Sequence, residues 1–147
     1  MRKYLFIAIG GMLGSISRFA IKNIHMWNYH ENTPLNTLFI NITGSFLLAL
    51  ILTIAFEVWN FDPDILLGIA TGFLGAYTTF STLCKETIKL MVSGEYFSAI
   101  FYITVSTMLG LAAAYLGIIL ARETIAKMVR SKRKEFVAEI IEEGDVE

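Results

Sequence analysis

Residues 72–82 read Gly-Phe-Leu-Gly-Ala-Tyr-Thr-Thr-Phe-Ser-Thr. The stretch lies inside a longer apolar segment, residues 65–91, and combines two glycines with four serine and threonine residues. Glycine and β-branched threonine are poor helix formers, and hydroxyls compete for backbone hydrogen bonds. We therefore expect the helix of this segment to break between Gly75 and Thr79. The alternative is an unbroken helix whose hydroxyls bond back by one turn.

This segment is one of several that are long and apolar enough to cross a membrane. A spanning helix needs about 20 mostly apolar residues, and stretches of that kind occupy residues 4–24, 36–56, 65–91 and 97–120. The sequence therefore predicts an all-α membrane protein with four transmembrane helices. The first stretch is alternatively a secretory signal, but it lacks a small-residue cleavage site.

The composition supports a membrane protein and divides the chain in two. Charged residues make up 17% of the 147 residues, against roughly 25% in typical globular proteins, and the mean hydropathy is +0.60. Residues 1–122 form the predicted transmembrane domain, and residues 123–147 form a charged, amphipathic tail. Such a tail is either a helix on the membrane surface or a solvated appendage. No arrangement of residues resembles an enzyme's active site, and a net charge of −1 offers no footprint for nucleic acid.

The positive charges of the four-span core give almost no orientation bias. With four spans both termini share a side, and the core residues on that side are Arg2, Lys3 and Arg122. The other side carries Arg18, Lys22, Lys85 and Lys89. Three against four lets a core insert both ways. The tail favours an inside C-terminus by adding Lys127, Arg130, Lys132, Arg133 and Lys134.

Polar residues recur on single faces of two spans. Thr37, Asn41 and Ser45 follow one another every fourth residue in the second span, and Tyr102 and Ser106 share a face of the fourth. Such residues in a membrane are candidates for function because each must find a partner there. The alternative is that they hold helices together by hydrogen bonds.

Three further residues of the apolar segments each permit two interpretations. The positive ring edge of Phe80 can face an anion, although packing is the ordinary role of such a residue. Glu86 either lies deep in the membrane, which suggests proton coupling, or near the interface, as its lysine neighbours favour. Arg18 either attracts an anion to a vestibule or extends to the lipid head groups.

The motifs together resemble one family. Gly10-Gly11-Met-Leu-Gly14 with Arg18, Asn41-Ile-Thr-Gly-Ser45, and the whole of residues 72–82 are similar to the Fluc (CrcB) fluoride channels. The resemblance covers residues 1–120. It implies an antiparallel, dual-topology dimer in the inner (plasma) membrane with two anion pores. It further implies passive export of cytoplasmic fluoride, which protects the cell from fluoride toxicity.

The resemblance also implies roles for particular residues. Arg18 would be the vestibule arginine, and Glu86 would lie near the end of a polar track. The backbone carbonyls of Gly75 and Thr78, from both subunits, would coordinate a structural sodium ion at the dimer centre. The fluoride pore would be formed by Thr37, Asn41, Phe80, Ser81, Thr82, Tyr102 and Ser106.

One position departs from the family pattern. The family usually has a second phenylalanine three residues after the first, and this chain has Leu83. Leucine has no positive ring edge, which leaves open altered conduction or a partner subunit that supplies the missing ring. The alternatives to a homodimeric channel are therefore one subunit of an obligate heterodimer and a non-conducting structural subunit. A small multidrug-type exporter, also of four spans, is a further alternative.

Overall fold

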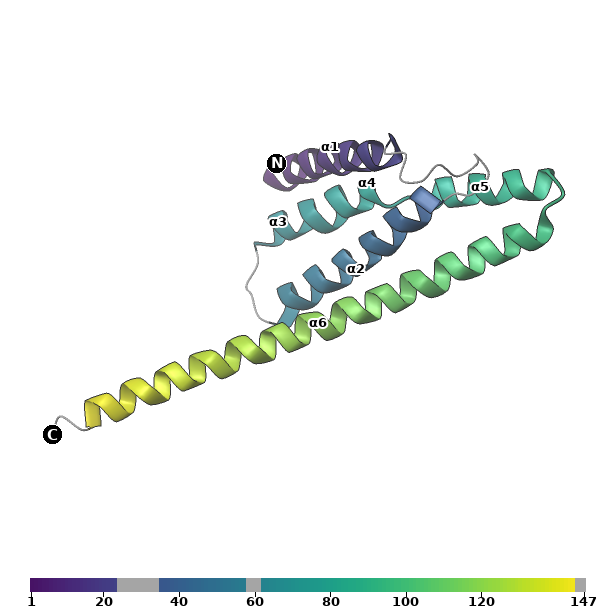
Figure 1. Cartoon of the computed structure of the whole chain (residues 1–147). Helices are drawn as coiled ribbons and strands as arrows, with labels where there is room; N and C mark the ends of the chain where they lie inside the picture. The colour runs from purple at the N-terminus through teal and green to yellow at the C-terminus, as the bar shows by residue number, and fades with distance from the viewer. Residues whose placement is uncertain (24–34, 58–61, 145–147) are drawn as a thin grey trace.

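The computed structural model describes residues 1–23, 35–57 and 62–144, with side chains through residue 127. Every regular element in these ranges is helical. The elements are α1 (Arg2–Asn23), α2 (Leu35–Glu57), α3 (Pro63–Leu67), η1 (Gly68–Leu74), α4 (Gly75–Tyr77), α5 (Phe80–Val92) and α6 (Tyr96–Gly144). Figure 1 shows α1 beside α3 and α4, with α2 between these and the long α6.

The prediction of an all-helical protein with four spans is confirmed. In the described residues, the helical segments long and apolar enough to cross a membrane are four: Arg2–Asn23, Leu35–Glu57, Pro63–Val92 and Tyr96–Lys127. Both termini lie at the same end of the bundle, as an even number of spans requires (Figure 1).

The third span consists of several helical pieces. It begins where the Asp62 side chain accepts a hydrogen bond from the Asp64 N–H at 2.9 Å, which caps α3. The helical backbone ends at Tyr77, because Thr78 (ψ 158°) and Thr79 (φ −150°, ψ 108°) are both extended. A new helix, α5, starts at Phe80, and the Thr79 side chain caps it. The interruption thus falls on the two threonines, whereas Gly75 is helical.

A π-helical stretch, η1, precedes the interruption, and it packs against α1 through glycines. A Cβ added at Gly10 would overlap the carbonyl oxygen of Gly68 and lie 2.9 Å from the Phe73 nitrogen. A Cβ added at Gly72 would lie 2.7 Å from the carbonyl oxygen of Ile7. Only glycine lets the two backbones approach this closely. We call this contact the glycine interface.

Helix α2 lies at the centre of the bundle and packs along α6. Its Ile40 is fully buried and forms a core with Leu74 and Tyr77 of the third span. A Cβ at Gly117 of α6 would come within 2.5 Å of the Phe46 carbonyl oxygen, so these helices also approach closely. The position of α2 between the third span and α6 brings its polar face next to both.

Helix α6 continues from the fourth span into the tail as one helix of 49 residues. No helix end marks the predicted boundary between residues 122 and 123. Near that position, Arg122 pairs with Glu57 at 2.9 Å, and Arg2 pairs with Asp62 on the same side of the bundle. These ion pairs join the start of α1 to the residue before α3, and the middle of α6 to the end of α2.

Candidate functional site

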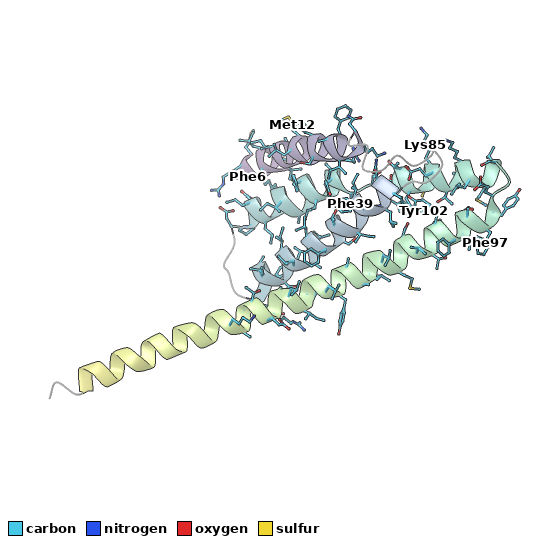
Figure 2. The ribbon with its side chains drawn as sticks, viewed as in Figure 1. Phe6, Met12, Phe39, Lys85, Phe97 and Tyr102 are labelled. Atoms are coloured by element: carbon cyan, nitrogen blue, oxygen red, sulfur yellow. The ribbon has the colours of Figure 1, made fainter. Side chains whose placement is uncertain are left out.

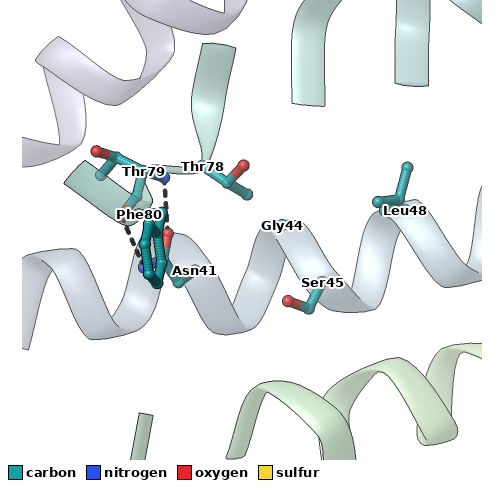
Figure 3. A pocket seen from close by; sticks show the side chains of 7 residues that line it. All are labelled: Asn41, Gly44, Ser45, Leu48, Thr78, Thr79 and Phe80. Carbon is teal, nitrogen blue, oxygen red and sulfur yellow. Dashed lines mark hydrogen bonds between the residues drawn. The ribbon is translucent and has the colours of Figure 1, made fainter. Parts of the chain in front are cut away.

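Asn41 of α2 holds the interruption of the third span by two hydrogen bonds. Its Oδ1 accepts from the Thr79 backbone N–H at 2.9 Å, and its Nδ2 donates to the Thr79 carbonyl oxygen at 3.1 Å (Figure 3). One side-chain amide therefore satisfies both backbone groups of an extended residue inside an apolar bundle. This is the pairing that a broken helix needs where water is absent.

A pocket of about 250 Å³ opens beside this pair. Its lining residues come from α2, from the interruption and from the first residue of α5, and Figure 3 shows all of them: Asn41, Gly44, Ser45, Leu48, Thr78, Thr79 and Phe80. Asn41 and Phe80, which the sequence singled out separately, thus line the same space. The Phe80 side chain is 78% exposed, so its ring faces outward from this chain.

Gly44 allows the interruption to lie directly on α2. A Cβ added there would overlap the Cγ2 of Thr78 and lie 3.3 Å from the Tyr77 ring. Thr78 in turn donates from its hydroxyl to the Leu74 carbonyl oxygen at 2.9 Å. A larger residue at position 44 would push the extended segment away from Asn41.

Hydroxyl groups continue from the interruption into α5. The Thr79 hydroxyl donates to the Thr82 hydroxyl at 2.8 Å and accepts from the Thr82 backbone N–H at 3.2 Å. It also lies 3.4 Å from the Ser81 hydroxyl. Ser81 is exposed and Thr82 is half-buried. The structure therefore places both residues next to Thr79, one turn or less beyond the pocket.

Glu86 lies between two other predicted site residues. The Thr37 hydroxyl donates to its Oε1 and the Tyr102 hydroxyl donates to its Oε2, each at 2.8 Å. Thr37 is 1% exposed and Tyr102 is 8% exposed. Tyr102 lies toward the end of the bundle away from the termini, as does Lys85 (Figure 2). The group joins α2, α5 and α6, and with Asn41 and Thr79 it forms what we call the polar interface.

Ser106 lies one helical turn from Tyr102 on α6 and is buried. Its hydroxyl has no hydrogen-bond partner within the part of the chain whose side chains are described. Most buried polar groups are paired, so an unpaired one calls for an explanation such as a ligand or a bound water. Ser106 is thus a buried hydroxyl whose hydrogen-bonding capacity is not used within the described side chains.

The interruption also redirects the hydrogen bonds of Gly75 and Thr78. In a continuous helix their carbonyls would accept from the N–H groups of Thr79 and Thr82. Those N–H groups are instead bonded to Asn41 and to the Thr79 hydroxyl. Gly75 is exposed, and a Cβ there would meet only Ala70 O, at 3.9 Å. The backbone at Gly75 is therefore exposed at the surface of this chain, and Thr78 beside it is half-buried.

Arg18 and Leu83 belong neither to the pocket lining nor to the polar interface. Arg18 is half-buried on α1, one turn after Gly14, and belongs to the other side of the third span from α2. Leu83 is buried, 8% exposed, and its carbonyl accepts from the Thr87 hydroxyl at 2.9 Å. The leucine that replaces the expected second aromatic ring therefore packs inside the chain.

Sequence reasoning did not name Thr79, Gly44 or Leu48 as site residues. Thr79 is the junction of the site, since it bonds Asn41 through its backbone and the α5 hydroxyls through its side chain. Thr79 directly precedes a helix and lies three residues before Thr82, the spacing at which an N-cap hydroxyl accepts from a backbone N–H. This N-cap pattern could have identified Thr79. Gly44 and Leu48 line the pocket through the fold alone, and no local pattern identifies them.

Comparisons with known proteins give one consistent result. The family model described as "CrcB-like protein, Camphor Resistance (CrcB)" matches residues 5–118. A protein of Acidobacterium capsulatum named "Fluoride-specific ion channel FluC" is 38% identical, over 84% of this chain and 99% of its own length. "Fluoride-specific ion channel FluC 1" of Bacillus anthracis is 42% identical, over 80% of this chain and 87% of its own length. "Fluoride-specific ion channel FluC" of Thermus thermophilus is 39% identical, over 80% of this chain and 93% of its own length.

Proposed function

The chain belongs to the CrcB-like family, and from that membership we propose that it is a fluoride-selective ion channel. It is a multi-pass protein of the plasma membrane, with four helices long enough to span it. Its function is to let cytoplasmic fluoride leave the cell down its electrochemical gradient. The observation that carries this proposal is the pocket at the helix interruption, where Asn41 and Phe80 meet.

The chemistry of this pocket suits fluoride. Fluoride is small, strongly hydrated and a strong hydrogen-bond acceptor, so a dry pore must replace its water with donors. A fixed positive charge would hold the ion instead of passing it, since conduction requires binding weak enough to release. The pocket lining contains amide and hydroxyl groups and no lysine or arginine. Asn41 has two N–H donors, of which Thr79 takes one, and the second serves the ion.

The path continues along the polar interface. The positive edge of the Phe80 ring faces the anion beside Asn41. Beyond it, the hydroxyls of Ser81, Thr82 and Ser106 supply further donors. Thr37 and Tyr102 mark the far part of the path, with Glu86 near its end. The Glu86 carboxylate accepts hydrogen bonds from the Thr37 and Tyr102 hydroxyls.

A second, antiparallel subunit completes the channel. The Phe80 ring is exposed in a single chain, and the accessible backbone of Gly75 lies on the outside of the third span. In the proposed dimer, the extended residues Thr78 and Thr79 form the break in the third span of each subunit. The Gly75 and Thr78 carbonyls are hard oxygen ligands of the type that Na⁺ accepts, and two from each subunit would enclose the ion at the centre. This sodium has a structural role and takes no part in conduction.

The direction of flow follows from the membrane potential. An inside-negative potential favours the exit of an anion by about 2.3 kcal/mol per charge at 100 mV. Undissociated hydrogen fluoride crosses membranes and ionises in the cytoplasm, so fluoride accumulates there unless it has an exit. A passive pore is sufficient, and no energy source is needed.

Fluoride efflux from liposomes that contain only this purified chain tests the proposal. A fluoride electrode follows the release, and chloride-loaded liposomes are the control. We expect fast fluoride release and no chloride release above that of empty liposomes. Equal release of both ions, or no fluoride release from well-folded protein, would contradict the proposal.

A further inference from the structure

Tyr77 is the last helical residue before the interruption, and the proposed fluoride path does not use its side chain. It is 6% exposed and forms a core with Ile40 and Leu74. Its ring stacks on that of Phe73, nearly parallel and with centroids 6.1 Å apart. The Tyr77 hydroxyl therefore lies inside an apolar bundle, where a polar group must find a hydrogen-bond partner.

The partner of this hydroxyl is Thr43 of α2. The two hydroxyl oxygens lie 2.9 Å apart. Thr43 also bonds back along its own helix, to the carbonyl oxygen of Phe39 at 2.8 Å and to that of Ile40 at 3.2 Å. A hydroxyl has one proton, and the bonds to these carbonyls use the proton of Thr43. Tyr77 is therefore the donor in the bond between the two hydroxyls, and Thr43 is the acceptor.

Thr43 and Asn41 hold the third span from two sides of α2. Residues two apart on a helix are separated by about 200° around its axis, so these side chains point to nearly opposite sides. Asn41 bonds the backbone of Thr79, and Thr43 bonds the side chain of Tyr77. Between these contacts the chain passes over Gly44 (Figure 3), where an added Cβ would lie 3.3 Å from the Tyr77 ring. The interruption is thus anchored on both sides of the helix that it crosses.

The backbone of Tyr77 is held from the other direction by α1. A Cβ added at Gly14 would lie 3.1 Å from the Tyr77 nitrogen. Tyr77 therefore reaches from α1, which its backbone contacts, to α2, which its hydroxyl contacts. The bond to Thr43 acts on the chain at the residue where the helix ends.

The two extended residues depend on these anchors for their position. Thr78 and Thr79 lie outside the regular pattern of helical hydrogen bonds that fixes a backbone. Phe80, which lines the pocket, follows them directly. A shift of Tyr77 away from α2 would move the Thr79 backbone away from Asn41, and the pocket would change with it.

We propose that the hydroxyl of Tyr77 is a positioning group for the pocket. Through Thr43 it holds the interruption on α2, so that Asn41 and Phe80 line one space. This inference rests on the proposed function, because the pocket is the proposed place of the fluoride ion. Tyr77 does not touch the ion and acts through the Thr79 backbone. The alternative is that the bond between Tyr77 and Thr43 only holds two helices together.

Amide hydrogen exchange at Thr79 tests the positioning without any ion flow. The Thr79 N–H is bonded to Asn41 at 2.9 Å, and it exchanges only when that bond opens. Exchange is followed by NMR on the full chain in detergent. In Tyr77→Phe we expect the Thr79 amide to exchange about three- to tenfold faster, with parental rates for the amides of α1 and α6. An unchanged Thr79 rate, or an equal increase in all three regions, would overturn the proposal.

Substitutions at Thr43 provide the matched set. Thr43→Ser keeps the acceptor and should keep the parental Thr79 rate. Thr43→Val removes the acceptor and should raise that rate as much as Tyr77→Phe does. It also leaves the buried Tyr77 hydroxyl without its partner, which should lower the melting temperature. The double variant should exchange no faster than either single variant and should recover the melting temperature lost in Thr43→Val. Additive increases in exchange would show that the two residues act separately and would overturn the proposal.

Fluoride efflux from liposomes then connects the position of the interruption to conduction. Tyr77→Phe leaves no buried donor unpaired, because Thr43 keeps its bond to the Phe39 carbonyl. We expect it to keep a melting temperature close to the parental one and to release fluoride several-fold more slowly. Thr53→Val removes an α2 hydroxyl that bonds back to the Ala49 carbonyl at 2.8 Å, and this control should match the parent.

Parental efflux from Tyr77→Phe, together with a faster Thr79 amide, would overturn the positioning role. A parent that releases no fluoride would contradict the proposed function instead. The exchange rates would then still decide whether Tyr77 holds the interruption on α2.

Discussion

The glycine interface between α1 and η1 and the polar interface among α2, α5 and α6 lie on opposite sides of the third span. At the first, Gly10 and Gly72 bring backbone against backbone, and there is no room for a side chain or an ion. At the second, Asn41, Thr79 and Glu86 join helices through side-chain hydrogen bonds beside an open pocket. One region therefore packs helices backbone to backbone, and the other holds the polar groups of the proposed fluoride path.

The largest effect is expected from Gly10→Ala, compared with Gly11→Ala. A Cβ at position 10 would overlap the Gly68 carbonyl oxygen, whereas one at position 11 would meet only the Gly72 carbonyl oxygen, at 4.0 Å. Overpacking typically costs about 1–3 kcal/mol, and a clash with backbone costs more because backbone cannot rotate away. We expect little monodisperse protein in detergent for Gly10→Ala and parental amounts for Gly11→Ala. Equal yields and melting temperatures would show that the glycine interface is looser than described.

Tyr102→Phe is expected to have the next largest effect, and on conduction instead of folding. It removes the hydroxyl that donates to Glu86 at 2.8 Å. In the proposed path the same hydroxyl donates to the passing ion. Losing a hydrogen bond to a charged group costs about 1.5–3 kcal/mol, which corresponds to roughly tenfold or more in affinity for the ion, and fluoride efflux should fall with it. Tyr115→Phe, at an exposed position of the same helix, is the control and should conduct like the parent. Parental efflux from Tyr102→Phe would remove the far part of the proposed path.

Ser106→Ala is expected to separate stability from conduction. Its hydroxyl is buried and unpaired in the described part of the chain, and such a group costs about 1–3 kcal/mol. Its removal should leave the melting temperature equal or higher, while fluoride efflux falls several-fold because the ion loses a donor. Thr107→Ala removes an adjacent hydroxyl that bonds back to Ile103 and serves as the control. A loss of stability with unchanged efflux would assign Ser106 to packing.

The smallest effect on conduction is expected from Leu83→Phe. Leu83 is buried and is not among the residues that line the pocket, so it belongs with the packing residues. The larger ring should cost about 1–3 kcal/mol of stability without a faster fluoride efflux, and Leu83→Met, of similar volume, should cost less. A faster efflux from Leu83→Phe would mean that the ring reaches the ion and that the parent lacks an aromatic contact.

The sequence was sufficient to predict the four spans, because hydrophobic length and interrupting charges are properties of the chain itself. It also located the unusual stretch around Thr78 and Thr79, where glycine and hydroxyl residues are concentrated. It did not predict the π-helical residues 68–74, which pack against α1 in the fold. Nor did it predict the unbroken continuation of α6 at residue 122, because the charge pattern changes there while the helix propensity does not.

Most residues of the candidate site could be predicted from the sequence, but the contacts between them could not. Thr37, Glu86 and Tyr102 were each identified separately. No spacing rule predicts that hydroxyls of α2 and α6 both donate to the Glu86 carboxylate of α5. Thr79 was not predicted to be a site residue, because it bonds Asn41 through its backbone N–H and carbonyl, and every residue except proline has both groups. Contacts made through backbone groups and across helices depend on the fold, and only the structure contains them.

The most direct test of the central claim is fluoride efflux from liposomes containing Asn41→Asp. The substitution places a negative charge where the anion meets the pocket and removes the donor to the Thr79 carbonyl. Asn36→Asp, at a half-buried position near the start of the same helix and outside the pocket lining, is the matched control, and melting temperatures report whether both variants are folded. We expect Asn41→Asp to be folded and to release no fluoride above empty liposomes, while Asn36→Asp conducts. Efflux from Asn41→Asp at the parental rate would contradict the assignment of this pocket to the fluoride pore.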